Sequence, residues 1–177
     1  EFDPKNENSF APALANRIDR NTGGIVIAAK NAEALRILCD KIKYSEMDKR
    51  YLAVVHGIPN KKSDTLEGFL EKNESKNQVY LKNSKTAEAK TIKTKYRVLQ
   101  SKNNLSLLEI ELLTGRTHQI RAHMASIGHP LLGEGKYNKS TKDRKMGFDK
   151  QALYSYSLKF DFKTDAGILN YLNGKRF

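Results

Sequence analysis

Two stretches of alternating residues in the middle of the chain constrain the fold most. Between positions 92 and 98 every second residue is Ile, Thr, Tyr or Val, which is typical of a half-buried strand. The turn-forming residues 101–104 lead into residues 107–113, where the acidic side chains point away from the apolar ones. The two stretches therefore predict a β-hairpin with one buried face.

A strand, a helix and a second strand precede this hairpin. Residues 25–30 are apolar enough for a short buried strand, and Asn31 is a suitable N-cap. Apolar residues then recur every three or four positions, which predicts an amphipathic helix that ends near Met47. Residues 49–55 are rich in β-formers. Because a helix joins the two strands, we expect the second to return beside the first.

Further strands and one further helix complete the expected elements. Residues 64–70 and 151–162 have strand patterns, and residues 71–85 are polar enough for a loop or a hairpin. Thr117 is a suitable N-cap for a helix that Gly128 would end. Many strands with few helices, and neither a repeat nor a linker, predict the α+β class.

The net charge of the chain indicates a polyanionic partner. Its 177 residues suggest one domain, residues 1–177, and Lys and Arg number 32 against 20 Asp and Glu, a net charge of +12. Nucleic acid is the simplest partner for that charge. A basic membrane-surface protein should contain a strongly amphipathic cationic helix, and the sequence has none. A basic surface that only aids solubility is the open alternative.

Cysteine usage and apolar runs bear on the compartment. Cys39 is the single cysteine, which excludes an intramolecular disulfide, and its place on an apolar helix face predicts a buried thiol. There is no run of about 18 apolar residues and no signal-peptide pattern, so we expect a cytoplasmic protein that does not enter a membrane. Residues 1–9 are expected to be disordered or left from cloning.

The most suggestive polar cluster surrounds Asp19. This carboxylate stands between Arg17 and Arg20 and is followed by the Thr-Gly-Gly turn of residues 22–24. Such a turn can present a side chain at the mouth of a sheet, and two arginines beside one acid favour an anion site. An ordinary surface charge cluster is the competing interpretation.

Several common site chemistries do not fit the sequence. His118 and His123 are five residues apart, and the other two histidines stand alone, so no metal site is expected. No Walker-type phosphate loop and no serine nucleophile elbow is present. A carboxylate, a tyrosine and arginines remain. Taken alone, Tyr51 could be a core aromatic and Arg121 a helix-surface cation.

Four segments, in order along the chain, resemble the RluA-type family of RNA pseudouridine synthases. The family's His-Arg-Leu-Asp motif and Thr-Gly turn correspond to residues 16–19 and 22–23. Its Lys-x-Tyr-x-Ala strand corresponds to residues 49–53. Its Thr-Gly-Arg-x-His-Gln-h-Arg-x-His-Met motif, where h is apolar, matches residues 114–124, and its His-Pro-Leu-x-Gly-Asp turn matches residues 129–134 with Glu in place of Asp.

The resemblance assigns roles to residues of this chain. It implies that Asp19 is the catalytic carboxylate, that Arg121 pairs with it, and that Tyr51 contacts the target uracil and assists a proton transfer. Arg17 resembles the arginine that fills the gap left by an extruded nucleotide. The other substrate-binding residues implied are Thr22, Arg116, His118 and Gln119.

The implied reaction is the isomerisation of specific uridines in structured RNA to pseudouridine. The base leaves its N1 bond and rejoins the sugar through C5, so no cofactor and no metal is needed. Asp19 either attacks C1′ or removes a sugar proton, and the sequence leaves both routes open. The resemblance also implies a largely antiparallel sheet with flanking helices, an active site in a basic cleft, a monomer, and ribosomal RNA rather than transfer RNA as substrate.

The chain departs from the family pattern at several places. Asn16 replaces the usual histidine of the motif, Tyr154 stands where histidine is common, and Glu134 replaces aspartate. The Lys-Pro-x-Gly segment that usually precedes the Asp19 motif is missing, so we expect a catalytic domain that lacks its N-terminal part. A non-catalytic RNA-binding domain that retains the fold is the alternative.

Overall fold

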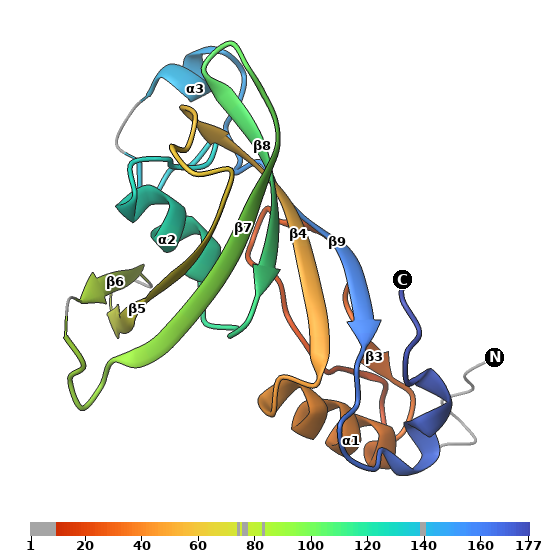
Figure 1. Ribbon diagram of the computed structural model, residues 1–177. Coiled ribbons are helices and arrows are strands. Elements are labelled where there is room, and N and C mark those ends of the chain that lie inside the picture. Colours follow the sequence, from red (N-terminus) through yellow and green to blue (C-terminus); the bar gives the residue numbers. More distant parts are fainter. Residues whose placement is uncertain (1–9, 74, 76–77, 83, 139–140) are drawn as a thin grey trace.

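A twisted sheet forms the body of the computed structural model, which describes residues 10–73, 75, 78–82, 84–138 and 141–177 (Figure 1). Within these residues the sheet has seven strands in the order β2-β9-β4-β8-β7-β5-β6. Only β2 and β9 pair in parallel, and every other pair is antiparallel. The strands are β2 (Gly23–Gly24), β4 (Met47–His56), β5 (Ser63–Asn73), β6 (Gln78–Lys82), β7 (Lys90–Lys102), β8 (Leu105–Leu112) and β9 (Leu153–Phe160).

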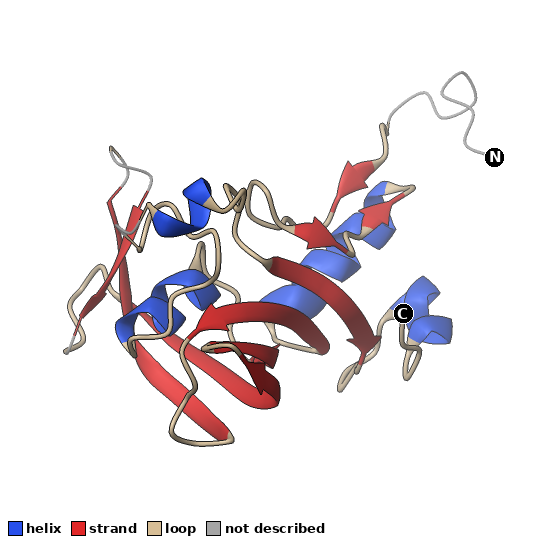
Figure 2. Ribbon diagram, turned by 90° about the horizontal axis from the view of Figure 1, so that it is seen from above, coloured by secondary structure: helices blue, strands red, loops and turns tan. Residues whose placement is uncertain are grey.

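The helices lie at two separate places along this sheet (Figures 1 and 2). Helix α2 (Gln119–Ser126) packs on the face formed by the middle strands, with the short α3 (Lys142–Lys145) near one end of them. Helix α1 (Ala32–Lys43), the 3₁₀ helix η1 (Gly167–Leu172) and the small sheet of β1 (Ala13–Leu14) and β3 (Ala28–Ala29) gather at the other end. Among the described residues no helix is long and apolar enough to cross a membrane.

The alternation of β4 explains which face of the sheet is covered. Tyr51, Ala53 and Val55 are buried and pack with Ile120 and Met124 of α2, whereas the residues between them are only half-buried. Burial of a large aliphatic side chain contributes about 1.5–3 kcal/mol, so this pattern fixes the register of β4. Helix α2 therefore supports β4 on one face of the sheet.

The predicted hairpin is confirmed as β7 and β8. Its turn has Asn103 and Asn104 at φ values of 52° and 58°, a left-handed pair that suits tight hairpins. Residues 78–82 form β6, which pairs with β5, so the hairpin alternative for the polar stretch is the correct one. The α+β prediction is likewise confirmed.

The prediction of one buried strand over residues 25–30 is wrong. Gly23 and Gly24 pair with β9, Ala28 and Ala29 pair with β1, and Val26 between them is 44% exposed. The expected neighbour is wrong as well, because β4 lies between β8 and β9. The physical reason is the glycine pair, which lets the chain leave one sheet and join another within a few residues.

The first helix is shorter than predicted. Asn31 is its N-cap as expected and accepts a hydrogen bond of 2.8 Å from the backbone of Ala34, but the helix ends at Lys43 and Met47 already begins β4. Ser45, with a φ of 57°, makes the turn between them. Cys39 is exposed, which contradicts the buried thiol predicted for it. The predictions for residues 1–9 fall outside the described residues.

Candidate active site

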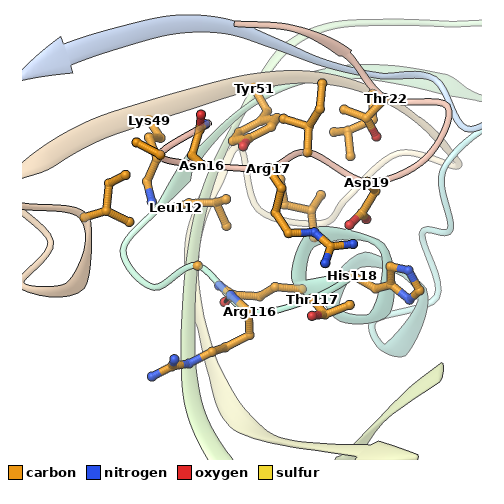
Figure 3. A pocket seen from close by; sticks show the side chains of 17 residues that line it. Asn16, Arg17, Asp19, Thr22, Lys49, Tyr51, Leu112, Arg116, Thr117 and His118 are labelled. Atoms are coloured by element: carbon orange, nitrogen blue, oxygen red, sulfur yellow. Dashed lines mark hydrogen bonds between the residues drawn. The ribbon is translucent and has the colours of Figure 1, made fainter. Parts of the chain in front are cut away.

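A cavity of about 270 Å³ lies at the junction of the Asp19 segment, β4 and the start of α2. Figure 3 shows side chains from these three parts of the chain around it. The segment of residues 15–19 lines one wall, Lys49 and Tyr51 line a second, and residues 115–120 line a third. Elements far apart in sequence therefore meet at one hollow, which is the usual setting of a binding site.

The Asp19 turn is fixed to the sheet by its neighbours. The Asn16 side chain accepts a 2.7 Å hydrogen bond from the backbone of Ile27. Gln151 donates bonds of 2.6 Å to the Arg20 carbonyl and 3.2 Å to the Thr22 hydroxyl. Asn16, which replaces the family histidine, thus supports the loop directly, and the turn holds Asp19 in one place.

Gly24 explains why the turn can approach β9 so closely. Its φ is +115°, and a Cβ at this position would lie 2.1 Å from the Ser155 carbonyl oxygen. No residue with a side chain fits such a position without movement of the backbone. The glycine therefore allows the parallel pairing of β2 with β9 that places Asp19 beside the pocket.

Arg121 connects Asp19 to a second, fully buried carboxylate. Its Nη1 lies 3.6 Å from Asp19 Oδ2, as predicted, but its closer partner is Glu134, reached at 2.7 Å and 2.8 Å by two nitrogens. The Glu134 side chain is 0% exposed. Burial raises the pKa of Glu134, but the hydrogen bonds and charge of Arg121, together with the backbone N–H groups of Lys136 and Tyr137, outweigh burial, and the net pKa is lowered.

This bidentate pair sets the position of the guanidinium. Because Glu134 also accepts hydrogen bonds from the backbone of Lys136 and Tyr137, its own position is fixed. A guanidinium held by a planar fork has little rotational freedom. Arg121 therefore directs its remaining nitrogen, Nη1, toward Asp19. Glu134 does not touch Asp19 and influences it only by holding Arg121 in place.

Tyr51 faces the same pocket from β4. The pairing of β4 with β9 shifts register between Arg50 and Tyr51, and such a bulge re-aims the side chain beside it. Burial raises the pKa of the phenol, a hydrogen bond with Ser155 opposes that effect, and the Asp19 charge adds to it. The phenol is therefore protonated at neutral pH.

The loop before α2 is held by the amide of Gln119. Its oxygen accepts bonds from the Thr114 hydroxyl at 2.9 Å and the Arg116 backbone at 3.1 Å. Its nitrogen donates to the Lys93 carbonyl at 3.0 Å and the Thr94 hydroxyl at 2.9 Å. Both hydrogens of the amide are thus used inside the protein, so Gln119 shapes the pocket wall. The direct contact with substrate that the resemblance implies for Gln119 stays a prediction.

The helix start differs from the prediction. The N-cap of α2 is His118, not Thr117, and its backbone is left-handed with φ 52° and ψ 19°. This conformation turns the chain sharply, so Arg116, Thr117 and His118 all line the pocket. Local sequence pattern favours threonine as a cap, whereas the packing of the loop decides the outcome here.

Three cations of the pocket have no acidic partner among the residues that the structure describes. Within the described part of the chain, no carboxylate lies within 4.0 Å of the charged groups of Arg17, Lys49 or Arg116. Burial lowers the pKa of Lys49, whose amine lies against Gly115. Asp19 is the single carboxylate lining the pocket. The pocket is therefore positively charged and suited to an anionic ligand.

Most predicted site residues come together in the structure. Asp19, Tyr51 and the predicted substrate-binding side chains line the cavity, and Arg121 lies directly behind Asp19. No role was predicted for Lys49, Glu134 or Tyr137. Lys49 stands in the quoted strand motif and Glu134 in the quoted turn, so both had a local signal, whereas Tyr137 had none. The described residues contain no group of three or more metal-ligating side chains.

A carboxylate held by an arginine in a basic pocket, on a mixed sheet, defines a protein that acts on or binds a polyanion. Comparison with known families makes this specific: the family described as RNA pseudouridylate synthase matches residues 1–126. The chain belongs to the RNA pseudouridylate synthase family. The resemblance noted in the sequence is thereby confirmed.

Individual relatives agree with this assignment. The chain is 34% identical over 156 residues to the ribosomal large subunit pseudouridine synthase D of Borreliella burgdorferi, covering 88% of this chain and 47% of the relative. It is 37% identical over 163 residues to an uncharacterized RNA pseudouridine synthase of Mycoplasma genitalium, covering 90% and 50%. The chain thus spans about half the length of the curated relatives it matches.

Solved structures share the fold. Human RNA pseudouridylate synthase domain containing 1 superposes with a TM-score of 0.75 at 23% identity, covering 88% of this chain and 66% of that one. Human RNA pseudouridylate synthase domain containing 4 gives a TM-score of 0.70 at 20% identity, covering 83% and 66%. The mixed, largely antiparallel sheet is therefore the fold of these synthase domains.

Proposed function

We propose that this chain is the catalytic part of an isomerase that converts uridines in structured RNA to pseudouridine. The observation that carries the proposal is the contact of 3.6 Å between Asp19 and Arg121 at a basic pocket that Tyr51 also faces. Family membership supports the reaction, and the printed names of two relatives, ribosomal large subunit pseudouridine synthase D, support ribosomal RNA over transfer RNA.

In this proposal the carboxylate of Asp19 acts at the ribose. Its Oδ2 is oriented by Arg121, which Glu134 holds in turn. Carboxylates serve as covalent nucleophiles at sugar carbons and as proton acceptors, and either role requires the group to lie at C1′ or C2′ of the target nucleotide. A fixed carboxylate reaches such a geometry without further reorganisation.

Tyr51 would contact the base while Arg17 replaces it in the RNA stack. A stacked uridine hides its C1′, so the enzyme must extrude it at a cost of about a few kcal/mol. A guanidinium can stack in the vacated place, and Arg17 is exposed at the pocket with no acidic partner among the described residues. Lys49 and Arg116 would hold the flanking phosphates.

The reaction neither adds nor removes atoms, so the proposal includes no cofactor and no metal. The bond between C1′ and N1 breaks, the base turns, and a bond between C1′ and C5 forms; C5 then loses its proton and N1 gains one, so the atoms balance. The Tyr51 phenol, which is protonated at neutral pH, is placed to take part in this proton transfer. We further propose that the enzyme works as a monomer in the cytoplasm, where ribosomal RNA is found.

The test is conversion of RNA by the purified protein. Wild type is incubated with ribosomal and transfer RNA from cells that lack the gene, and pseudouridine is mapped by position; the same reaction is run with Asp19→Asn. We expect site-specific conversion by wild type and none by the variant, with RNA affinity retained. Equal binding by both proteins without product from either would favour the non-catalytic RNA-binding alternative, and conversion by Asp19→Asn would remove the assignment of the carboxylate.

A further inference from the structure

His118 occupies a strained position at the pocket. Its left-handed backbone, with φ 52° and ψ 19°, is uncommon among residues other than glycine, although histidine adopts it more often than most, and its side chain is largely buried. Such a conformation costs about 1–2 kcal/mol relative to the right-handed region. Residues kept in strained conformations cluster at functional sites, where surrounding contacts hold them.

Tyr137 provides the contact that holds the ring. Its hydroxyl lies 2.8 Å from His118 Nδ1 and accepts a 3.1 Å hydrogen bond from the backbone N–H of Val79 in β6. The Arg121 guanidinium also lies over the Tyr137 ring, 5.5 Å from its centroid. The imidazole is thus tied to a strand outside the pocket through one phenol.

This arrangement favours one position for the imidazole proton. Burial raises the pKa of Tyr137 to about 12, so the phenol keeps its proton at neutral pH. Since Val79 already donates to the hydroxyl oxygen, the hydroxyl proton is directed to the remaining partner, Nδ1 of His118. A neutral imidazole that accepts at Nδ1 carries its own proton on Nε2.

Burial keeps the His118 ring neutral. Burial lowers the pKa of His118, and the groups that face it oppose one another: Asp19 and Glu134 raise the pKa, while Arg121 and Lys136 lower it. The net direction is downward, so the ring is uncharged at neutral pH. Within the described part of the chain, Nε2 has no hydrogen-bond partner and is not fully buried.

The His118 ring lies at the Asp19 end of the pocket. Figure 3 shows His118 and Asp19 on one side of the pocket and Lys49 on the other, and the Asp19 charge acts on the imidazole. Given the proposed function, the carboxylate marks the place of the target ribose carbons and Tyr51 that of the base. A neutral donor next to C1′ and C2′ faces the oxygen attached to C2′.

We propose that His118 binds the 2′-hydroxyl of the target ribose through Nε2–H, with Tyr137 as the residue that positions it. The 2′-hydroxyl is the group by which proteins distinguish RNA from DNA at a given nucleotide. The pocket would thereby check the sugar before Asp19 acts on it. This inference rests on the proposed function, because it takes Asp19 to mark the ribose.

The variant His118→Asn isolates the Nε2 donor. Asparagine tolerates left-handed backbone, so the turn is preserved, and its side-chain oxygen can accept the Tyr137 hydroxyl in place of Nδ1. No group then remains at the position of Nε2. The matched variant Tyr137→Phe keeps the histidine and the ring contact with Arg121 but removes the hydroxyl that orients the imidazole.

The readout is the preference for ribose at one nucleotide. Two RNAs that differ only in carrying uridine or 2′-deoxyuridine at the target position are titrated with Asp19→Asn protein, so that no conversion occurs. A neutral hydrogen bond worth about 0.5–1.5 kcal/mol corresponds to a preference for uridine of about 2–12-fold. The Asp19→Asn protein is the parent, and His118→Asn is added to it. We expect the double variant to bind both RNAs with the affinity that the parent has for the RNA with 2′-deoxyuridine.

Each outcome decides the inference. A preference in the His118→Asn protein equal to that of the parent overturns it, and so does a parent without any preference. If His118→Asn is too unstable to titrate, Tyr137→Phe serves: its preference should fall at least twofold, and an unchanged ratio again overturns the inference. Wild-type protein is assayed in parallel for conversion, which separates the proposed function from the role of His118. Pseudouridine formation without a sugar preference refutes only the role of His118.

Discussion

The buried pair of Glu134 and Arg121 offers the most quantitative test of the site's construction. In Glu134→Gln the side chain keeps its size and one carbonyl oxygen, but the second oxygen becomes an amide whose hydrogens face the guanidinium. One hydrogen bond from Arg121 is therefore lost, and the other changes from ion–ion to ion–neutral. The buried cation keeps only Asp19, at 3.6 Å, as a charged partner.

These losses can be converted to an expected change in stability. Hydrogen bonds between charged groups contribute about 1.5–3 kcal/mol and neutral ones about 0.5–1.5 kcal/mol, so the substitution should lower the free energy of unfolding by about 2–4 kcal/mol. For a chain of this size that corresponds to a fall in Tm of roughly 5–15 °C. Denaturant titration followed by circular dichroism measures the free energy directly.

Acid should reduce the difference between the two proteins. The pKa of Glu134 is lower in the folded chain than in the unfolded one, so its stabilising contribution is complete above the unfolded pKa. The contribution is lost as pH falls through the folded pKa. The gap in unfolding free energy between wild type and Glu134→Gln should therefore be largest near neutral pH and shrink below about pH 4.3.

Glu109→Gln is the matched control. Glu109 also bonds two arginines, Arg50 and Arg97, but its side chain is 12% exposed and lies on the sheet face away from α2. Partly exposed pairs contribute about 0–1 kcal/mol, so this variant should lose little stability and no activity. Equal losses in the two variants, or a pH-independent gap for Glu134→Gln, would refute the claim that buried pairing with Arg121 builds the site.

Three further substitutions test other parts of the structure. Gly24→Ala should lower the free energy of unfolding by at least about 2 kcal/mol in denaturant titration, because its Cβ meets the Ser155 carbonyl, whereas Gly128→Ala, with no atom within 4 Å of its Cβ, should lose only about 1 kcal/mol. Arg116→Gln should weaken RNA binding and reduce the slope of log affinity against log salt by about 1. Arg97→Gln is the control, and an equal reduction in its slope would contradict a phosphate contact in the pocket. Asn16→Ala should cost about 1 kcal/mol of stability by leaving the Ile27 N–H unpaired, and it should lower kcat more than RNA affinity; a change in affinity alone would argue against its support of the Asp19 turn.

The sequence allowed most strands and the residues that meet at the pocket to be predicted because both leave local patterns. Alternation identified β7 and β8, and the ordered motifs identified Asp19, Tyr51 and Arg121 as partners across the chain. Each of these signals is contained in a few consecutive residues. The contact of Asp19 with Arg121 then followed from the resemblance and from charge.

The parts that were mispredicted depend on contacts between distant segments. The place of β4 between β8 and β9 is decided by tertiary packing, which periodicity does not encode. The left-handed cap at His118 arises because Tyr137 and the pocket loop hold it, against the local preference for threonine. Glu134 was noticed as a departure from the family motif, but its bidentate bond with Arg121 appears only in three dimensions.

The pairing of β2 with β9 has a consequence for synthesis. The segment bearing Asp19 leaves the ribosome before the residues that fix it, because Gln151 follows Arg20 by 131 positions. Chains emerge at roughly 5–20 residues per second, so the nascent protein passes several seconds with the Asp19 carboxylate unanchored. A nascent polypeptide that has not yet reached β9 should therefore lack the pocket, and the site proposed for Asp19 forms only after that strand has been added.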